Sequence, residues 1–154
     1  MGFHFTFGWV CKEKDMNQQG VMMVFNKDVI ESIDTSIGKC EKESGGIIGS
    51  VDSVISCFEY DEDGSFDDEY VPNVEHLNKA IVNWSQNGIA FEGIVHSHKK
   101  TKRLSYADVS YARDIIRHNG IVYLYMLVYV LSEKQLYAYK VEEDRIIEEE
   151  ISIR

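Results

Sequence analysis

Gly93-Ile94-Val95-His96-Ser97-His98, followed after six residues by Ser105-Tyr106-Ala107-Asp108, is the most informative stretch of the chain. The apolar residues ahead of His96 predict a strand. Because alternate residues of a strand share one face, His96 and His98 are expected to project together from its C-terminal end. Ser105 stands where a helix N-cap belongs, and Asp108 follows it at the spacing of a capping box.

Two interpretations of these side chains are open from the residues alone. Ser105 and Asp108 can be explained by helix capping, and the histidines by an ordinary structural role. A short loop could equally return Asp108 to the two imidazoles. Two histidines and one carboxylate leave a fourth tetrahedral position for water, which is typical of catalytic rather than structural zinc. The pattern therefore favours neither interpretation over the other.

Segments of helical and strand character alternate around this stretch. Near-continuous apolar character in residues 121–131 predicts a central strand. The whole pattern indicates an α/β fold in which helices flank a mixed, largely antiparallel sheet. Helices are predicted over residues 26–38, 74–88 and 105–118, and the first of them has Asn26 as its cap and Gly38 as its stop. Strands are predicted over residues 3–11, 20–25, 47–58, 89–98, 121–131, 135–141 and 146–153.

Composition limits the classes of function. A single proline and the lack of a Gly/Ser tract predict one domain over residues 1–154. The formal charge of −10 repels polyanions, so nucleic acid is not expected as a partner. The acidic stretch around Gly64, which includes Asp61, is interpreted as a solvated hairpin loop. His4, His76 and His118 lack partners at ligand spacing and are expected to be structural or surface residues.

The expected location is the cytoplasm, without membrane contact. Residues 121–131 form the longest apolar stretch, well short of the roughly 20 residues that span a bilayer. The N-terminus lacks the pattern of a secretory signal. The three cysteines, Cys11, Cys40 and Cys57, suit neither a disulfide framework nor a Cys-x-x-Cys zinc site, so they are expected to be reduced and buried.

A family resemblance joins the motifs. Glu43-Ser44-Gly45-Gly46-Ile47-Ile48-Gly49, with His96-Ser97-His98 and Ser105-Tyr106-Ala107-Asp108, resembles the signature of the JAMM (JAB/MPN+) metallopeptidases. That signature has a glutamate ahead of Gly-Gly, a distant His-Ser/Thr-His and a Ser-x-x-Asp. The resemblance implies a deaminase-like JAB/MPN fold and one zinc ion per chain, with His96, His98 and Asp108 as its ligands. It further implies Glu43 as general base and Ser105 as donor to the oxyanion.

The same resemblance implies an activity. Compact, prokaryotic-type relatives suggest a peptidase or isopeptidase that cleaves at the C-terminus of a ubiquitin-like protein or its conjugate, as in the deconjugating proteases of CBASS-type antiphage operons. The alternatives are hydrolysis of small amide or carrier-protein adducts, and a non-catalytic MPN scaffold that only binds partners. A nucleobase deaminase is excluded, because neither His-x-Glu nor Pro-Cys-x-x-Cys is present.

Three details complete the sequence-based hypothesis. Glu43 is preferred as the base because it precedes Ser44-Gly45-Gly46, with Glu41 as the fallback. The family has proline after the second histidine and seven residues before the serine, whereas this chain has Lys99 and six residues. The connecting loop is also basic, and it is either a solvated loop or a contact for an acidic substrate. Its cations are Lys99, Lys100, Lys102 and Arg103.

Overall fold

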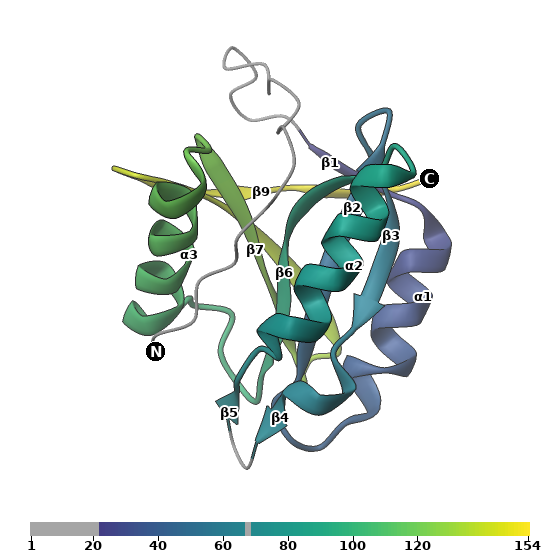
Figure 1. Ribbon diagram of the computed structural model, residues 1–154. Coiled ribbons are helices and arrows are strands. Elements are labelled where there is room, and N and C mark those ends of the chain that lie inside the picture. Colours follow the sequence, from purple (N-terminus) through teal and green to yellow (C-terminus); the bar gives the residue numbers. More distant parts are fainter. Residues whose placement is uncertain (1–21, 67–68) are drawn as a thin grey trace.

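A curved sheet with helices on both faces organises the chain (Figure 1). The structure is a computed structural model that describes residues 22–66 and 69–154. The strands of the main sheet are β1 (Met23–Phe25), β2 (Gly45–Val51), β3 (Val54–Tyr60), β6 (Ala90–His98), β7 (Tyr123–Val130), β8 (Gln135–Glu142), β9 (Ile146–Glu149) and β10 (Ile151–Ile153). Their order is β10-β1-β3-β2-β6-β7-β8-β9, and a separate pair joins β4 (Ser65–Phe66) to β5 (Glu69–Tyr70).

The sheet is mixed, as the sequence predicts. β2 is antiparallel to β3 and β6, and β8 is antiparallel to β7 and β9. The parallel pairs are β6 with β7, and β1 with both β3 and β10. β7 lies inside the sheet with both faces covered, which confirms the central position predicted from its apolar sequence.

The helices divide between the two faces of the sheet. They are α1 (Lys27–Thr35), α2 (Val74–Gln86) and α3 (Tyr106–Asn119), with short 3-10 turns η1 (Ile37–Lys39) and η2 (Glu62–Gly64). Leu77 of α2 and Ile115 of α3 share one buried cluster with Ile94 of β6. Ile33 of α1 belongs to a second cluster with Val95, the next residue of β6. Because successive strand residues point to opposite faces, α2 and α3 cover one face and α1 covers the other.

Helix ends follow the predicted signals with one exception. α2 and α3 match the predicted segments closely, and Asn73 and Ser105 cap them through their side chains. The predicted first helix stops at Thr35, and a separate turn, η1, contains Gly38. Asn26 occupies the N-cap position of α1 but makes no side-chain cap hydrogen bond. A Cβ at Gly38 would lie 2.8 Å from the hydroxyl of Tyr129, so tertiary packing rather than helix termination requires glycine there.

Two backbone features shape the sheet. β2 and β3 form a hairpin whose turn residues, Asp52 and Ser53, both have positive φ, the geometry of a tight two-residue turn. At the C-terminus, Glu150 alone separates β9, which pairs with β8, from β10, which pairs with β1. One nearly continuous segment therefore forms both edge strands of the sheet, so the sheet is strongly curved (Figure 1).

Several sequence-based expectations need correction. Asp61 is not part of a solvated loop, because it is completely buried and its Oδ2 accepts hydrogen bonds from the Tyr70 hydroxyl and the Asn73 backbone N–H, each at 2.8 Å. In the described ranges, Cys40 and Cys57 form no disulfide, and both are partly exposed rather than buried. The predicted strand at residues 3–11, together with His4 and Cys11, lies outside the described residues, and of residues 20–25 only part is described, including β1.

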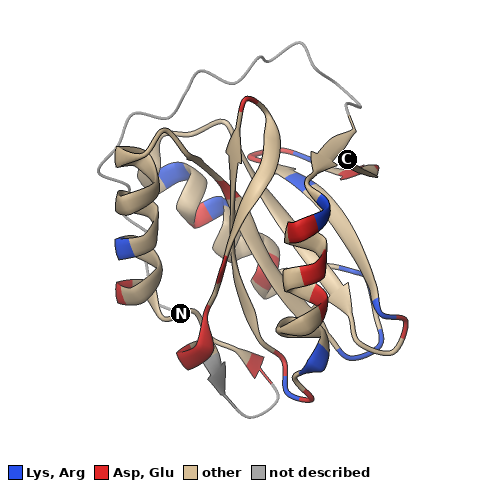
Figure 2. Ribbon diagram, turned by 90° about the vertical axis from the view of Figure 1, so that its right-hand side faces the viewer, with Lys and Arg blue, Asp and Glu red and all other residues tan. Residues whose placement is uncertain are grey.

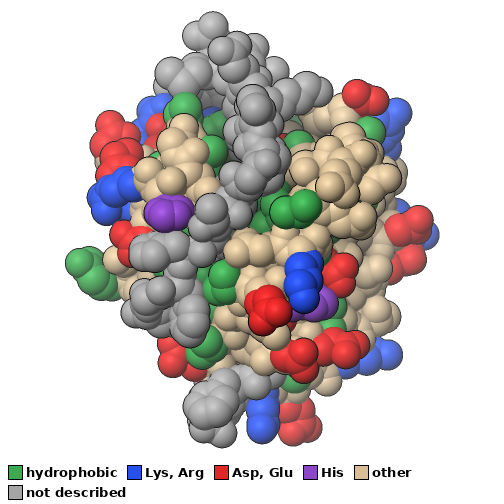
Figure 3. Space-filling model, in the orientation of Figure 1, with side chains coloured by type: hydrophobic (Ala, Val, Ile, Leu, Met, Phe, Trp, Pro, Cys, Tyr) green, Lys and Arg blue, Asp and Glu red, His purple; other side chains and the backbone are tan. Residues whose placement is uncertain are grey.

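The surface carries charges of both signs. On the face drawn in Figure 3, acidic and basic side chains are interspersed. His76 and His118 are exposed, and His76 Nε2 lies 3.5 Å from Glu59 Oε2, which agrees with a surface role. Within the described part of the chain, no helix is long and apolar enough to span a bilayer.

Candidate metal centre

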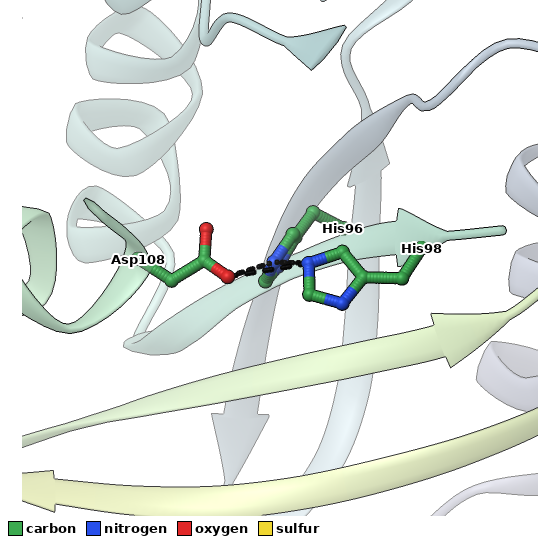
Figure 4. Close-up of side chains that lie close together, drawn as sticks. All are labelled: His96, His98 and Asp108. Atoms are coloured by element: carbon green, nitrogen blue, oxygen red, sulfur yellow. Dashed lines mark hydrogen bonds and ion pairs between the residues drawn. The ribbon is translucent and has the colours of Figure 1, made fainter. Parts of the chain in front are cut away.

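Three side chains converge at the C-terminal end of β6. His96 and His98 project from the strand on the face covered by α2 and α3, and Asp108 approaches from the first turn of α3 (Figure 4). Asp108 Oδ2 lies 3.2 Å from Nε2 of each histidine, and the two Nε2 atoms lie 3.1 Å apart. The structure therefore brings together the three residues that the sequence suggests as ligands, and this group could hold a metal ion.

Helix capping aims the carboxylate at the histidines. Asp108 Oδ2 accepts a hydrogen bond from the Ser105 backbone N–H at 2.9 Å, and Ser105 Oγ accepts one from the Asp108 backbone N–H at 3.0 Å. These two bonds make a capping box. Because the same Oδ2 faces both imidazoles, capping and ligand geometry are not alternatives here. The cap fixes the rotamer that points Asp108 into the site.

The ring of His98 is oriented by a backbone contact. Its Nδ1 lies 3.1 Å from the carbonyl oxygen of Thr101. A carbonyl only accepts, so Nδ1 carries the hydrogen, and in a neutral ring Nε2 presents its lone pair to the site. This is the arrangement found around histidines that bind metals through Nε2. The buried Nδ1 of His96 has no hydrogen-bond partner among the described residues, so Nε2 is also that ring's atom directed at the site.

The electrostatics of the group call for a positive charge. Two imidazole nitrogens and one carboxylate oxygen lie within 3.2 Å of one another, and their lone pairs repel unless a cation, either a proton or a metal ion, lies among them. Zinc–nitrogen bonds of about 2.0–2.1 Å in a tetrahedral site place ligands roughly 3.3–3.4 Å apart. The observed separations are close to that value, and the nitrogen and oxygen ligands suit zinc.

Ionisation is tuned within the group. Burial alone would raise the pKa of Asp108, but hydrogen bonds from His96 and His98 outweigh it and hold that pKa well below its ordinary value. The hydrogen bond to Asp108 in turn raises the pKa of His98, despite the opposing effect of burial. Asp108 is therefore an anion at neutral pH, as a metal ligand must be.

Glu43 lies beside this group. Burial raises the pKa of its carboxyl, and the nearby charges of His98, His96 and Lys99 partly oppose that rise. The half-buried Glu43 is thus within electrostatic reach of the histidines. Glu41, the fallback, is exposed and lines a separate recess.

The chain after Glu43 is fixed against β6. The Ser44 backbone N–H donates to Ser97 Oγ at 2.9 Å, and the Ser97 backbone N–H donates to the Ser44 carbonyl at 2.9 Å. A Cβ at Gly45 would lie 2.5 Å from the Tyr70 ring and the Val95 carbonyl, so the close approach requires glycine. Ser97, between the two histidines, thereby places Glu43 next to them.

Ser97 is part of the His-Ser-His motif, but no role for it was predicted from the sequence. Its position was the available signal: a polar residue between two candidate ligands points to the opposite face of the strand. There it is completely buried, where a hydroxyl needs a partner.

Comparisons with known proteins identify the fold. No protein-family profile and no curated protein sequence matches this chain. Among solved structures, protein DSY2949 from Desulfitobacterium hafniense aligns with a TM-score of 0.68 and 19% identity over 86% of this chain and 93% of its own. AF2198, a JAB1/MPN domain protein from Archaeoglobus fulgidus, aligns with a TM-score of 0.50 and 17% identity over 84% of this chain and 98% of its own. The resemblance stated from the motifs is confirmed at the level of architecture: the chain has the fold of JAB1/MPN domain proteins.

Proposed function

We propose that this chain is a zinc-dependent peptidase or isopeptidase that cleaves at the C-terminus of a ubiquitin-like protein or its conjugate. The observation that carries the proposal is the convergence of His96, His98 and Asp108, with Glu43 within electrostatic reach of all three. The ordered motifs resemble those of JAMM metallopeptidases, and the fold is that of JAB1/MPN domains. A non-catalytic scaffold has no need of a complete ligand set beside a half-buried glutamate.

His96 Nε2, His98 Nε2 and a carboxylate oxygen of Asp108 would hold one zinc ion per chain. When bound, zinc lowers the pKa of water to about 7 and polarises a carbonyl. The protein orients its ligands before any ion arrives. Thr101 fixes the His98 ring, and the capping box fixes Asp108.

Glu43 would move the proton. Its carboxylate takes a proton from the attacking water and returns it to the nitrogen of the leaving amine, which cannot depart as an anion. The pKa of Glu43, raised by burial, suits both steps, because a base with a higher pKa accepts a proton more readily and still releases it to an amine. Ser97 holds the backbone next to Glu43 and so limits the positions the carboxylate can take.

Ser105 would stabilise negative charge on the substrate. Its oxygen accepts the hydrogen bond from the Asp108 backbone N–H, which leaves the hydroxyl hydrogen available for donation. Ser105 is exposed at the N-cap of α3, three residues ahead of Asp108 in the first turn. A hydroxyl there can donate to the carbonyl oxygen as it becomes an oxyanion.

The test is cleavage of a defined substrate. A ubiquitin-like protein with a C-terminal peptide extension is incubated with the full chain, with the chain after chelation, and with chelated chain to which zinc is restored, and products are read by mass spectrometry. We expect cleavage directly after the ubiquitin-like domain, lost on chelation and recovered with zinc. Zinc binding without cleavage of ubiquitin-like fusions or simple amides would contradict the proposal and favour a scaffold.

A further inference from the structure

A recess of about 630 Å³ is lined in part by Lys99, the residue directly after the candidate ligand His98. Three segments form its walls: the η1 turn and the residues after it, the start of the loop after β6, and the turn between β7 and β8. Its charged lining consists of Lys39, Lys99, Lys100, Lys134 and Glu41.

The charge of this recess is opposite to that of the chain. Four lysines face one glutamate there, whereas the chain as a whole carries −10. All four lysines are exposed. In Figure 2, several blue segments, with a few red ones between them, lie towards the lower right of the molecule, below helix α1, which carries mainly red ones. A concave group of cations on an acidic protein concentrates anions locally and repels them elsewhere.

Hydrogen bonds hold the walls together. The Leu131 backbone N–H donates to the His98 carbonyl at 2.9 Å, and the Ser132 backbone N–H donates to the Lys99 carbonyl at 3.0 Å. Lys134 Nζ donates to the Gly38 carbonyl at 3.3 Å, which links the β7–β8 turn to η1. The positions from which the lysines extend are therefore fixed, so little backbone order has to be gained on binding.

The recess adjoins the reactive groups. Lys99 follows His98 directly, at the first position after β6. The charge of Lys99 reaches Glu43, whose pKa it lowers against the larger effect of burial. A chain that passes the end of β6 can contact the metal centre and the recess together.

The four lysines differ from the basic loop that the sequence suggests. Lys102 Nζ is paired with Glu148 Oε1 at 3.0 Å, and its backbone carbonyl accepts from the Tyr139 hydroxyl at 2.8 Å. Lys102 and Arg103 line a different depression, with Leu104 and Tyr139. The recess instead contains Lys39 and Lys134, which are distant in sequence from Lys99 and Lys100.

We propose that this recess binds a carboxylate-bearing segment of the protein substrate, next to the bond that is cleaved. The inference rests on the proposed function, since it names the chemistry by which that substrate is recognised. The carboxylates are either side chains of acidic residues or the terminal carboxylate of a peptide. Exposed ion pairs contribute about 0.2–1 kcal/mol each, so several lysines acting together give modest, salt-sensitive affinity.

The test measures binding without catalysis. Three fluorescein-labelled peptides are titrated with the full chain after chelation, and fluorescence anisotropy is read: a glycine–glutamate peptide with an amidated C-terminus, its glutamine counterpart, and the glutamine counterpart with a free terminal carboxylate. The recess variant is Lys39→Gln/Lys100→Gln. The control is Lys27→Gln/Lys79→Gln, which removes the same charge from α1 and α2, where both lysines pair with glutamates.

We expect the glutamate peptide, the peptide with the free carboxylate, or both, to bind more tightly than the neutral one. The recess variant should raise the Kd of the preferred peptide about five- to tenfold and flatten its salt dependence, whereas the control should leave both nearly unchanged. Equal binding of the three peptides, or equal losses in both variants, would overturn the inference. The binding assay needs neither metal nor hydrolysis. A chain that cleaves no substrate would therefore contradict the proposed function, whereas the inference about the recess is decided by the peptide titrations alone.

Discussion

One oxygen of Asp108 serves two purposes. Oδ2 accepts the N-cap hydrogen bond from Ser105 and faces Nε2 of His96 and His98. A carboxylate that only capped the helix would be satisfied by the backbone and could remain in solvent. Here the carboxylate is mostly buried and its pKa is held low by the two imidazoles, against the opposing effect of burial. Local capping chemistry thus preorganises a ligand.

At Glu43, we predict that Glu43→Gln leaves metal content and stability nearly unchanged but lowers kcat by about 10²–10⁴-fold, since only the proton carrier is lost. Steady-state kinetics alongside metal analysis check this. Glu41→Gln is measured alongside it, because Glu41 is the alternative candidate for the base. Full turnover in Glu43→Gln together with an inactive Glu41→Gln would show that the neighbouring carboxylate is the base.

Ser97 is expected to position Glu43. Ser97→Ala removes the acceptor of the buried Ser44 N–H, which should lower the free energy of unfolding by about 1–3 kcal/mol. It should also lower kcat more than it changes KM, because Glu43 loses its fixed position.

The control for that effect is Ser50→Ala, which removes another buried serine hydroxyl of the same sheet, one that donates to Glu92 Oε1 at 2.7 Å. Urea unfolding and kinetics of both variants separate positioning from stability. If both variants lose stability and neither loses kcat, Ser97 has only a structural role.

The buried carboxyl of Asp61 should make the free energy of unfolding depend on pH. Burial raises its pKa, and hydrogen bonds from Asn73 and Tyr70 only partly oppose that rise. The ionised form is thus disfavoured in the fold, and this penalty is relieved as pH falls through the raised pKa. The unfolding free energy of the wild type minus that of Asp61→Asn should therefore increase as the pH falls from neutral towards about 4, the ordinary pKa of an aspartate. Urea denaturation at each pH checks the sign, and a difference that shrinks on acidification would contradict it.

Among the elements, the start of α3 combines a cap with a proposed oxyanion donor. Ser105→Ala should destabilise the protein by about 1 kcal/mol, whereas Ser105→Gly should cost only a few tenths, because glycine is tolerated at the N-cap. Both lack the hydroxyl, so both should lose kcat to a similar extent. Thermal unfolding and kinetics of the two variants check this. If Ser105→Gly is nearly fully active and only the less stable Ser105→Ala loses kcat, then Ser105 caps the helix and does not donate to the oxyanion.

The loop from Lys99 to Leu104 is held at several points. His98 Nδ1 donates to the Thr101 carbonyl, and the Tyr139 hydroxyl donates to the Lys102 carbonyl. These contacts show how a loop one residue shorter than the family pattern still delivers Ser105 and Asp108 to β6. Lys99, which stands where the family pattern has proline, accepts a hydrogen bond from the Ser132 backbone N–H through its carbonyl and so continues the pairing with the turn after β7.

At the scale of the whole molecule, the features that could be predicted from the sequence are those that depend on neighbouring residues in the chain. Caps and apolar periodicity located α2 and α3, and strand alternation placed His96 and His98 on one face. The short loop between strand and helix made the grouping of His96, His98 and Asp108 possible without deciding it, and the resemblance to the JAMM signature is what predicted it.

Features that depend on distant pairing were not predictable in this way. The burial of Asp61 depends on contacts with Tyr70 and Asn73. The partner of Lys102 comes from β9, and the recess collects lysines from three separate segments. The two successive C-terminal strands, β9 and β10, form opposite edges of the sheet, a consequence of curvature that periodicity does not report.

The metal content of the purified full chain tests the central claim most directly. After incubation with zinc and removal of the unbound ion, mass spectrometry of the metal should find about one zinc per chain in the wild type. His96→Ala and Asp108→Ala should each lose most of it, while Lys27→Gln should keep it, since Lys27 lies on α1. A wild-type chain without zinc, or full zinc in both ligand variants, would contradict the account.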